Sequence, residues 1–420
     1  MKHTFSSKSI IIFIMLFIIP SLMCLAQNND NYSLYKAIVI DKNSGDPLAY
    51  AGITIEGTNY STVSNSDGEF AIKLLSSIDN AVINIQFIGY KSKSIHVKDL
   101  KNDKNKIELE PVTVELPEIS VISKDAESLV ISMLEKKGLN YGNQEEHLTA
   151  FYRESIRRNK TYASLSEAVV DVYKQSYNSY KSDIVKIYKA RKKTDYSKLD
   201  TLVFKLQGGP FNSLYLDLMK NPEMIFTDKM LENYEFIFDR STRIGKRLIY
   251  VVDFKQKKYV EEPLYYGKLY IDAQSLALKT ATFKLNLANK EAASQMFIVK
   301  KPYNADAYPI ETNYRIDFLE KDNKWYYGYS RIELGLRINW KKKLFNTSFY
   351  STIEMAVTDK DKSDYDKETM NKDRIRPQIV IADEVSGFAD PDFWGEFNVI
   401  EPEKPIEAAI RKIQKQLIKK

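Results

Sequence analysis

The sequence predicts a mainly β protein, with an N-terminal β-sandwich followed by a large curved antiparallel sheet and a few covering helices. Three observations predict this class. Short apolar runs separated by turn residues occupy residues 38–90, and long runs that alternate apolar with charged side chains follow residue 148. The chain also contains 28 tyrosines and 20 phenylalanines, which favour strands. An antiparallel sheet with one face toward water produces such alternation.

Residues 1–26 have the pattern of a secretory signal peptide. Lys2 and Lys8 precede an uncharged apolar run over 10–19, and the small residue Ala26 suits cleavage before the mature chain. The run is shorter than the roughly 20 residues that span a bilayer as a helix. We therefore expect an exported protein of the periplasm or outer-membrane envelope, without a transmembrane segment in the mature chain.

Lipid attachment at Cys24 is disfavoured, because Met23 stands where lipoprotein processing needs a small residue. Cleavage after Ala26 leaves a mature chain without cysteine, so neither disulfides nor a thiol nucleophile are expected. The whole chain has 62 basic and 56 acidic residues, a balance too mild to predict nucleic-acid binding.

Residues 27–115 are predicted to form the sandwich. Residues 43–47 have turn chemistry, with Gly45 able to adopt positive φ and Pro47 interrupting strand pairing. Residues 66–68, Ser-Asp-Gly, form a second turn signal. The lengths and spacing of the apolar runs predict about seven strands.

An ordered set of residues in this segment matches a known domain: Asp41, Gly45, Pro47, Leu48, Ala51, Ile53, Gly57, Thr58, Thr62, Asp67, Gly68, Phe70, Gly89 and Tyr90. The segment resembles the carboxypeptidase-regulatory-like domain, a prealbumin-like sandwich that also precedes many TonB-dependent receptors of Bacteroidetes. Ala37 and Ser61 depart from the glycines frequent in that family. The resemblance implies an interaction module rather than a catalyst.

The regulatory domain carries no zinc site of its own, and the sequence contains none of the expected ligand patterns. Catalytic zinc needs about three protein ligands. His3 lies in the leader, and His96 and His147 have no histidine or carboxylate partner at helical spacing. We expect surface or turn histidines, no metal, no cofactor and no carboxypeptidase activity. No receptor plug or barrel is expected after residues 116–121, which resemble the segment that leads to the plug.

After a linker over 116–123, the domain over 124–404 is predicted to begin with a helix near 124–137. Ser123 is the expected N-cap and Gly138 the expected stop. Hairpin turns are predicted at 244–246, 272–275 and 321–324. Eight or more strands should form a half-barrel-like curved sheet, interrupted by a short helix near 212–220.

Two resemblances concern this second domain. Residues 267–285 resemble a hairpin of LolA- and LolB-like lipoprotein carriers, whose open half-barrel is covered by helices. Residues 150–155, 166–174, 208–211 and 390–413 look like an uncharacterised exported family of Bacteroidetes. That family has no established activity, so the resemblance implies architecture alone.

Some polar groups could be catalytic or could bind ligands. Glu154 and Glu167, near Arg153, Arg157 and Arg158, could work as acid and base or form cross-strand salt bridges, which we favour. The stretch Gly208-Gly209-Pro210-Phe211 lacks the lysine of a phosphate loop and predicts a turn. Asn65, Asp67 and Glu69 could bind calcium, but an Asx turn explains them better.

Two basic segments could rest on an anionic surface. One is Lys341–Lys343 beside Trp340 and Phe345, for which a solvated turn at a strand edge is the simpler interpretation. The other is an amphipathic helix predicted over 405–420, with a basic face formed by Arg411, Lys412, Lys415, Lys419 and Lys420. We expect its apolar face to dock on the sheet.

The sequence thus favours a non-enzymatic exported binding or adaptor protein, with no catalytic residue assigned. Its expected partners are outer-membrane or periplasmic proteins or lipids. A structural accessory of an outer-membrane assembly and an unrecognised hydrolase are the alternatives. A deep apolar cavity would favour the first function, a filled sheet the second, and convergent carboxylates with raised pKa the third.

Overall fold

A computed structural model describes residues 32–418, apart from 79, 102–104, 113–124, 196, 198–207, 299–302, 304, 342–345, 361–371, 380–384 and 391. The predicted signal peptide, Cys24, His3 and the predicted linker over 116–123 lie outside the described residues, as do Lys342, Lys343, Phe345, Lys419 and Lys420 of the two predicted basic segments.

The N-terminal part is a sandwich of a three-stranded and a four-stranded sheet, as the strand signals predicted. Fifteen buried apolar side chains fill the space between the sheets, among them Ile53, Phe70 and Ile85. One feature differs from an all-antiparallel unit, because the first and last strands pair in parallel. The first sheet contains β4 (Glu69–Leu75), β1 (Tyr32–Asp41) and β7 (Asn105–Leu109); the second contains β3 (Ser61–Val63), β2 (Gly52–Ile55), β5 (Val82–Gln86) and β6 (Lys93–His96). Short 3-10 turns occupy Ser76–Ile78 and Val97–Asp99.

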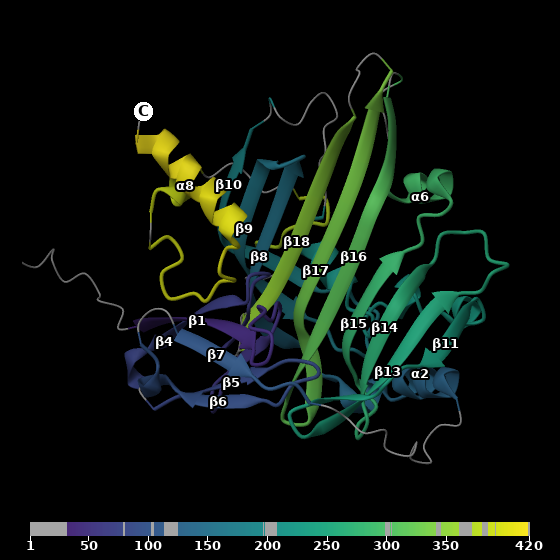
Figure 1. The fold of residues 1–420 in the computed structure, drawn as a ribbon, viewed down its shortest axis with the longest axis horizontal. Coiled ribbons are helices and arrows are strands. Elements are labelled where there is room, and N and C mark those ends of the chain that lie inside the picture. The colour runs from purple at the N-terminus through teal and green to yellow at the C-terminus, as the bar shows by residue number, and fades with distance from the viewer. Residues whose placement is uncertain are drawn as a thin grey trace, which may run out of the picture.

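The second part is an eleven-stranded antiparallel sheet, which confirms the predicted curved sheet (Figure 1). Its path begins with β10 (Ile184–Thr194), β9 (Thr161–Lys174), β8 (Glu146–Arg158), β18 (Thr347–Asp359) and β17 (Lys324–Trp340). It continues with β16 (Ala305–Lys321), β15 (Leu278–Leu285), β14 (Tyr265–Asp272), β13 (Arg247–Gln256) and β11 (Tyr234–Phe238), while β12 (Thr242–Ile244) also pairs with β13. The first and last long strands, β8 and β18, are neighbours in the middle of the sheet.

The hairpin turns follow the predicted chemistry. Gly245 has φ 58° between β12 and β13, and Asp322 and Asn323 have φ 52° and 60° between β16 and β17. Positive φ at both central residues gives a two-residue turn whose twist matches that of the flanking strands. The side chain of Asp272 accepts hydrogen bonds from the backbone of Gln274 and Ser275 in the third turn.

The helices begin and end somewhat differently from the predictions. α2 (Ala126–Glu135) is capped by Asp125, whose side chain accepts a hydrogen bond from Ser128 N, so Ser123 is not the N-cap. Gly138 lies inside α3 (Lys137–Asn140) and does not end the first helix. The short helix predicted near 212–220 is α4 (Pro210–Tyr215). The others are α5 (Asp228–Leu231), α6 (Lys290–Phe297) and α8 (Lys404–Ile418), with 3-10 turns at Pro222–Met224 and Val385–Phe388.

The two faces of the large sheet differ in chemistry. One face packs against α2, α4 and α5, and a continuous cluster of buried apolar side chains such as Leu129, Leu214 and Phe254 fills the space between them. The opposite face carries rows of charged side chains; we call it the polar face. The sandwich, residues 385–403 and α8 lie against part of it (Figure 1). No helix within the described residues combines the length and apolar character needed to cross a membrane.

Candidate functional site

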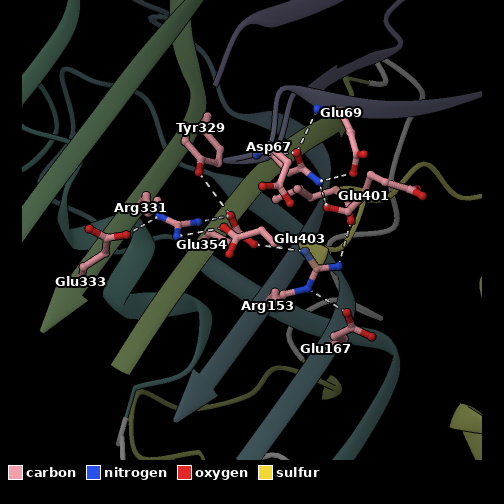
Figure 2. A network of polar contacts seen from close by, with 12 residues as sticks. Asp67, Glu69, Arg153, Glu167, Tyr329, Arg331, Glu333, Glu354, Glu401 and Glu403 are labelled. Carbon is pink, nitrogen blue, oxygen red and sulfur yellow. Dashed lines mark hydrogen bonds and ion pairs between the residues drawn. The ribbon is translucent and has the colours of Figure 1, made fainter. Parts of the chain in front are cut away.

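A row of alternating charges crosses five neighbouring strands on the polar face. Strand register places Arg191 of β10 opposite Glu167 of β9, and Glu167 opposite Arg153 of β8. The row continues with Glu354 of β18 opposite Arg153, and then Arg331 of β17. Residues directly opposite on one face interact closely, so this register alone brings opposite charges together (Figure 2).

Arg153 is the centre of this row and is almost fully buried. Its Nε lies 2.7 Å from Glu167 and its Nη1 lies 3.1 Å from Glu354. Its Nη2 donates to the carbonyl of Ile400 at 2.8 Å. The side chains of Arg153, Glu167 and Glu354 are 3%, 1% and 3% exposed. Burial would raise the pKa of Glu167, but the charges of Arg153 and Arg191 lower it below its ordinary value.

The two glutamates that could have formed an acid and base pair lie on opposite faces of the sheet. Arg153 and Glu154 are consecutive in β8, so their side chains point in opposite directions. Glu167 faces Arg153, whereas Glu154 accepts a hydrogen bond from Tyr152 at 2.7 Å on the helix-covered face. Cross-strand salt bridging, the favoured interpretation, therefore describes Glu167. Arg157 lies farther along β8 over the ring of Tyr350.

Glu154 gives a pH-dependent prediction. Burial raises its pKa, although the hydrogen bond from Tyr152 and the charge of Lys192 oppose that rise. At a pH between the ordinary pKa of a glutamate and the raised pKa of Glu154, the folded state binds more protons than the unfolded state. Glu154 therefore lowers the stability of the protein as the pH rises through that window. We expect the stability of Glu154→Gln, relative to that of the natural protein, to increase when the pH is raised from 4.5 to 7.5. Urea unfolding at both pH values measures this gain; a pH-independent difference between the two proteins would contradict it.

The same network ties the C-terminal segment to both domains. Arg331 pairs with Glu403 at 3.0 Å, and Lys36 of the sandwich pairs with Glu401 at 2.7 Å. The backbone N of Lys404 donates to Asp67 at 3.0 Å. Residues 400–404 thus form a link between the sandwich and the sheet, as Figure 2 shows for Glu401 and Glu403.

The suggested calcium ligands serve this link. The Asn65 side-chain oxygen accepts from the backbone N of Asp67 and of Glu69, each at 2.9 Å, which is the Asx-turn geometry. Its Nδ2 donates to the carbonyl of Glu401 at 3.3 Å. The turn therefore holds the C-terminal segment.

Tyr50 of the sandwich lies against the Arg331 end of the charged row. Its φ is 65°, a left-handed conformation that costs a non-glycine residue roughly 1–3 kcal/mol. Its ring stacks on Tyr329 with centroids 5.7 Å apart, and the guanidinium carbons of Arg315 and Arg331 lie 5.5 and 5.1 Å from its centroid. Burial raises the pKa of Tyr50. The tyrosine ring thus lies against two arginines of neighbouring strands.

A groove of about 650 Å³ begins at Tyr50 and runs across the open half of the polar face. Its apolar walls include Tyr50, Tyr266 and Ile237; the last two are 43% and 45% exposed. Its charged lining includes Arg315, Arg331, Lys268, Asp253, Glu333, Glu235, Lys255 and Lys284. The groove therefore lies on the face opposite α2, α4 and α5, and its lining is mixed, unlike the deep apolar cavity named above as favouring a binding protein.

The carboxylates that line the groove are engaged by neighbouring cations. Glu333 lies 2.9 Å from Arg331, Asp253 lies 3.0 Å from Lys268, and Glu235 lies 3.3 Å from Lys255. Arg315 donates to Asp317 on its own strand at 2.5 and 3.0 Å. These groups are ordered by ion pairs, and they leave hydrogen-bonding capacity toward the groove because carboxylate and guanidinium groups each make several bonds.

The remaining candidates lie apart from the groove. His96 is exposed on β6, but His147 is buried in β8, 3.4 Å from Asp171, so it is not the surface or turn residue that we expected. Gly208 and Gly209 have positive φ immediately before Pro210 begins α4, as a turn requires. Within the described residues, no group of three or more histidine, cysteine, aspartate or glutamate side chains is placed to hold a metal ion.

Comparisons with known proteins bear on the two domains. Residues 38–121 match the CarboxypepD_reg-like domain family. This confirms the sequence resemblance for the sandwich, which supplies Tyr50 and the Asx turn. No curated protein matches the chain.

Two solved structures show similarity at 11% identity. A LolA superfamily protein from Nitrosomonas europaea covers 59% of this chain and 98% of its own, with a TM-score of 0.21. A DUF1329 family protein from Desulfovibrio piger covers 55% and 90%, with a TM-score of 0.22. The first belongs to the superfamily that residues 267–285 resemble. At these scores neither similarity supports a statement about ligands.

Sequence reasoning missed the residues that form the groove. Arg315, Arg331 and Lys268 occupy alternate positions in strands, a pattern identical to that of solvent-facing side chains. Tyr50 is one tyrosine among 28. Only the placement of the sandwich against the sheet distinguishes them.

Proposed function

We propose that this chain is a non-enzymatic exported binding or adaptor protein of the periplasm or outer-membrane envelope, with its ligand or partner site in the groove at Tyr50. The observation that carries the proposal is that both domains contribute residues to the groove. The sandwich contributes Tyr50, the sheet contributes Arg315 and Arg331, and the volume of about 650 Å³ falls within the usual range of ligand sites. Strain at Tyr50 is typical of a residue retained for function.

The chemistry of the lining supports binding over catalysis. Glu333, Asp253 and Glu235 are each ion-paired, and the buried Glu154 lies on the other face of the sheet. Tyr50, Tyr266 and Ile237 offer apolar surface, while the ion pairs offer hydrogen bonds. A ligand or peptide segment with an apolar body and a few polar groups fits this lining, because polar groups fix orientation and apolar area supplies affinity.

Removing the two groove tyrosines tests the proposal. We expect Tyr50→Ala and Tyr266→Ala each to lower ligand retention at least tenfold, because an aromatic wall contributes about 1.5 kcal/mol or more when a ligand covers it. The measurement is mass spectrometry of lipids, small molecules and proteins that co-purify with each protein from envelope fractions. Tyr180→Ala is the matched control, since Tyr180 is fully exposed outside the groove.

Each possible outcome decides the proposal. Molecules retained by the natural protein and by Tyr180→Ala, but lost from both groove variants, support it. Equal retention by all four proteins, or retention by none, would contradict it. Point variants are preferable to deletion of the sandwich, because deletion would expose the apolar cluster around Phe151 and Trp394 at the junction.

A further inference from the structure

We propose that one end of the large sheet is a docking surface for an anionic phospholipid bilayer. The two basic segments found in the sequence, at Lys341 and in the C-terminal helix, are separated by about 70 residues of chain. The fold places both toward the same end of the molecule: α8 lies beside the start of β9 and the end of β10, and Lys341 directly follows the end of β17 (Figure 1). This inference is independent of the groove at Tyr50.

Strand register fixes this convergence. Ile338 near the end of β17 pairs with Thr347 at the start of β18, and Phe349 pairs with Arg158 at the end of β8. Arg158 in turn pairs with Thr161 across the β8–β9 hairpin. Basic side chains gather at these strand ends and on α8, a set that we call the basic end: Arg157, Arg158, Lys160, Lys193, Lys341, Lys412 and Lys415.

The basic end has a net positive charge, because the nearby acidic residues Asp195, Asp306 and Glu407 are fewer. Glu407 is already paired with Arg411 at 2.7 Å. Basic clusters of this kind are attracted to anionic leaflets, with about 1 kcal/mol for each side chain near the surface. Charge complementarity therefore selects a negatively charged surface.

A groove of about 440 Å³ lies between α8 and the start of β9. Lys160, Lys193 and Lys412 line it together with Tyr162, Ile413 and Ala409. Three ammonium groups beside apolar carbon match a phospholipid, whose phosphate would contact the lysines while the first part of its chains lies along the apolar wall.

α8 itself remains docked on the sheet in this arrangement. Ile406 is 3% exposed and packs with Leu165 and Phe388, so the apolar face of α8 is used within the protein. Trp340 is likewise packed against the cluster around Ile156 and is not free to insert. Tyr303 differs, because its ring is 97% exposed and lies 5.2 Å from Lys341 Nζ. Tyrosine at this position suits the headgroup level of a bilayer.

Vesicle sedimentation of the mature protein tests the proposal. We expect binding to phosphatidylcholine vesicles that contain phosphatidylglycerol, loss of that binding in high salt, and no binding to phosphatidylcholine alone. The triple variant Lys160→Gln, Lys341→Gln, Lys415→Gln should reduce the partition coefficient about 100-fold, since roughly 1 kcal/mol per cation corresponds to about fivefold each. All three lysines are exposed, so folding should be unchanged.

The matched control removes the same charge from the opposite end of the molecule. Lys98, Lys101 and Lys246 are exposed there, on the sandwich and on the β12–β13 turn. The variant that replaces these three by glutamine should keep its binding within a few fold. Equal losses in the two triple variants, equal binding to neutral vesicles, or no binding by the natural protein would each overturn the proposal. Ligand retention in the groove at Tyr50 is measured without vesicles and stays a separate result.

Discussion

Replacing Lys174 by methionine should lower the free energy of unfolding by about 3–5 kcal/mol. Lys174 Nζ lies 2.8 Å from both Asp183 and Asp217, and the three side chains are 1%, 6% and 0% exposed. Burial would lower the pKa of Lys174, but the two carboxylates raise it above its ordinary value. Methionine would leave two buried carboxylates without this cation. Urea unfolding at neutral pH measures the loss.

The position of the aspartates explains why this effect should be large. Asp217 also accepts a hydrogen bond from Tyr177 at 2.8 Å, so the cluster joins the segment after α4 to the end of β9. Lys106→Met is the control, because Lys106 and Glu108 form a pair at 3.7 Å that is 61% and 46% exposed. Such pairs contribute at most about 1 kcal/mol. Similar losses for Lys174→Met and Lys106→Met would contradict the prediction.

Replacing Arg153 by methionine should cost about 3 kcal/mol or more. Arg153 donates to Glu167, Glu354 and the carbonyl of Ile400, and charge-assisted hydrogen bonds contribute about 1.5–3 kcal/mol each. Each glutamate keeps one other arginine, Arg191 or Arg331, which limits the loss. Guanidinium chloride would screen these charges, so urea is the suitable denaturant.

This variant should also loosen the C-terminal segment, because Arg153 holds Ile400. We expect faster amide hydrogen exchange in residues 398–404 of Arg153→Met, with exchange in β14 and β15 unchanged. Arg411→Met is the matched control, since Arg411 pairs with Glu407 where the side chains are 62% and 46% exposed. A loss of stability below about 1 kcal/mol, or uniform exchange along the chain, would show that Arg153 does not form this link.

Sequence signals predicted the strands and hairpin turns well, because these elements depend on interactions between residues close together in the chain. The alternation of apolar and charged residues fixes strands, and turn residues such as Gly245, Asp322 and Asn323 fix hairpins, because φ preference and side-chain period act within a few residues. The N-cap of α2 was misplaced, since Ser123 and Asp125 are both good caps by chemistry. The choice between them depends on where packing of the helix begins.

The candidate site was less predictable. Predicting the salt bridges fully would have required both glutamate partners of Arg153. One of the two, Glu354, lies on β18, some 200 residues later in the chain. Glu154 and Glu167 looked like possible partners in sequence but face opposite sides. The position of β18 beside β8 decides both results, and pairing between distant strands has no local signal.

The sequence by itself determined that this protein is mainly β, that its first domain resembles the CarboxypepD_reg-like family, and that its expected catalytic and metal motifs are missing. Period, turn chemistry and residue identity carry that information locally. The tertiary structure alone decided that Tyr50 lies against Arg315 and Arg331, that the groove is on the polar face, and that the end of β17 lies toward the same end of the molecule as α8. These facts depend on long-range register and on sandwich packing, which place residues together only when the whole chain has folded.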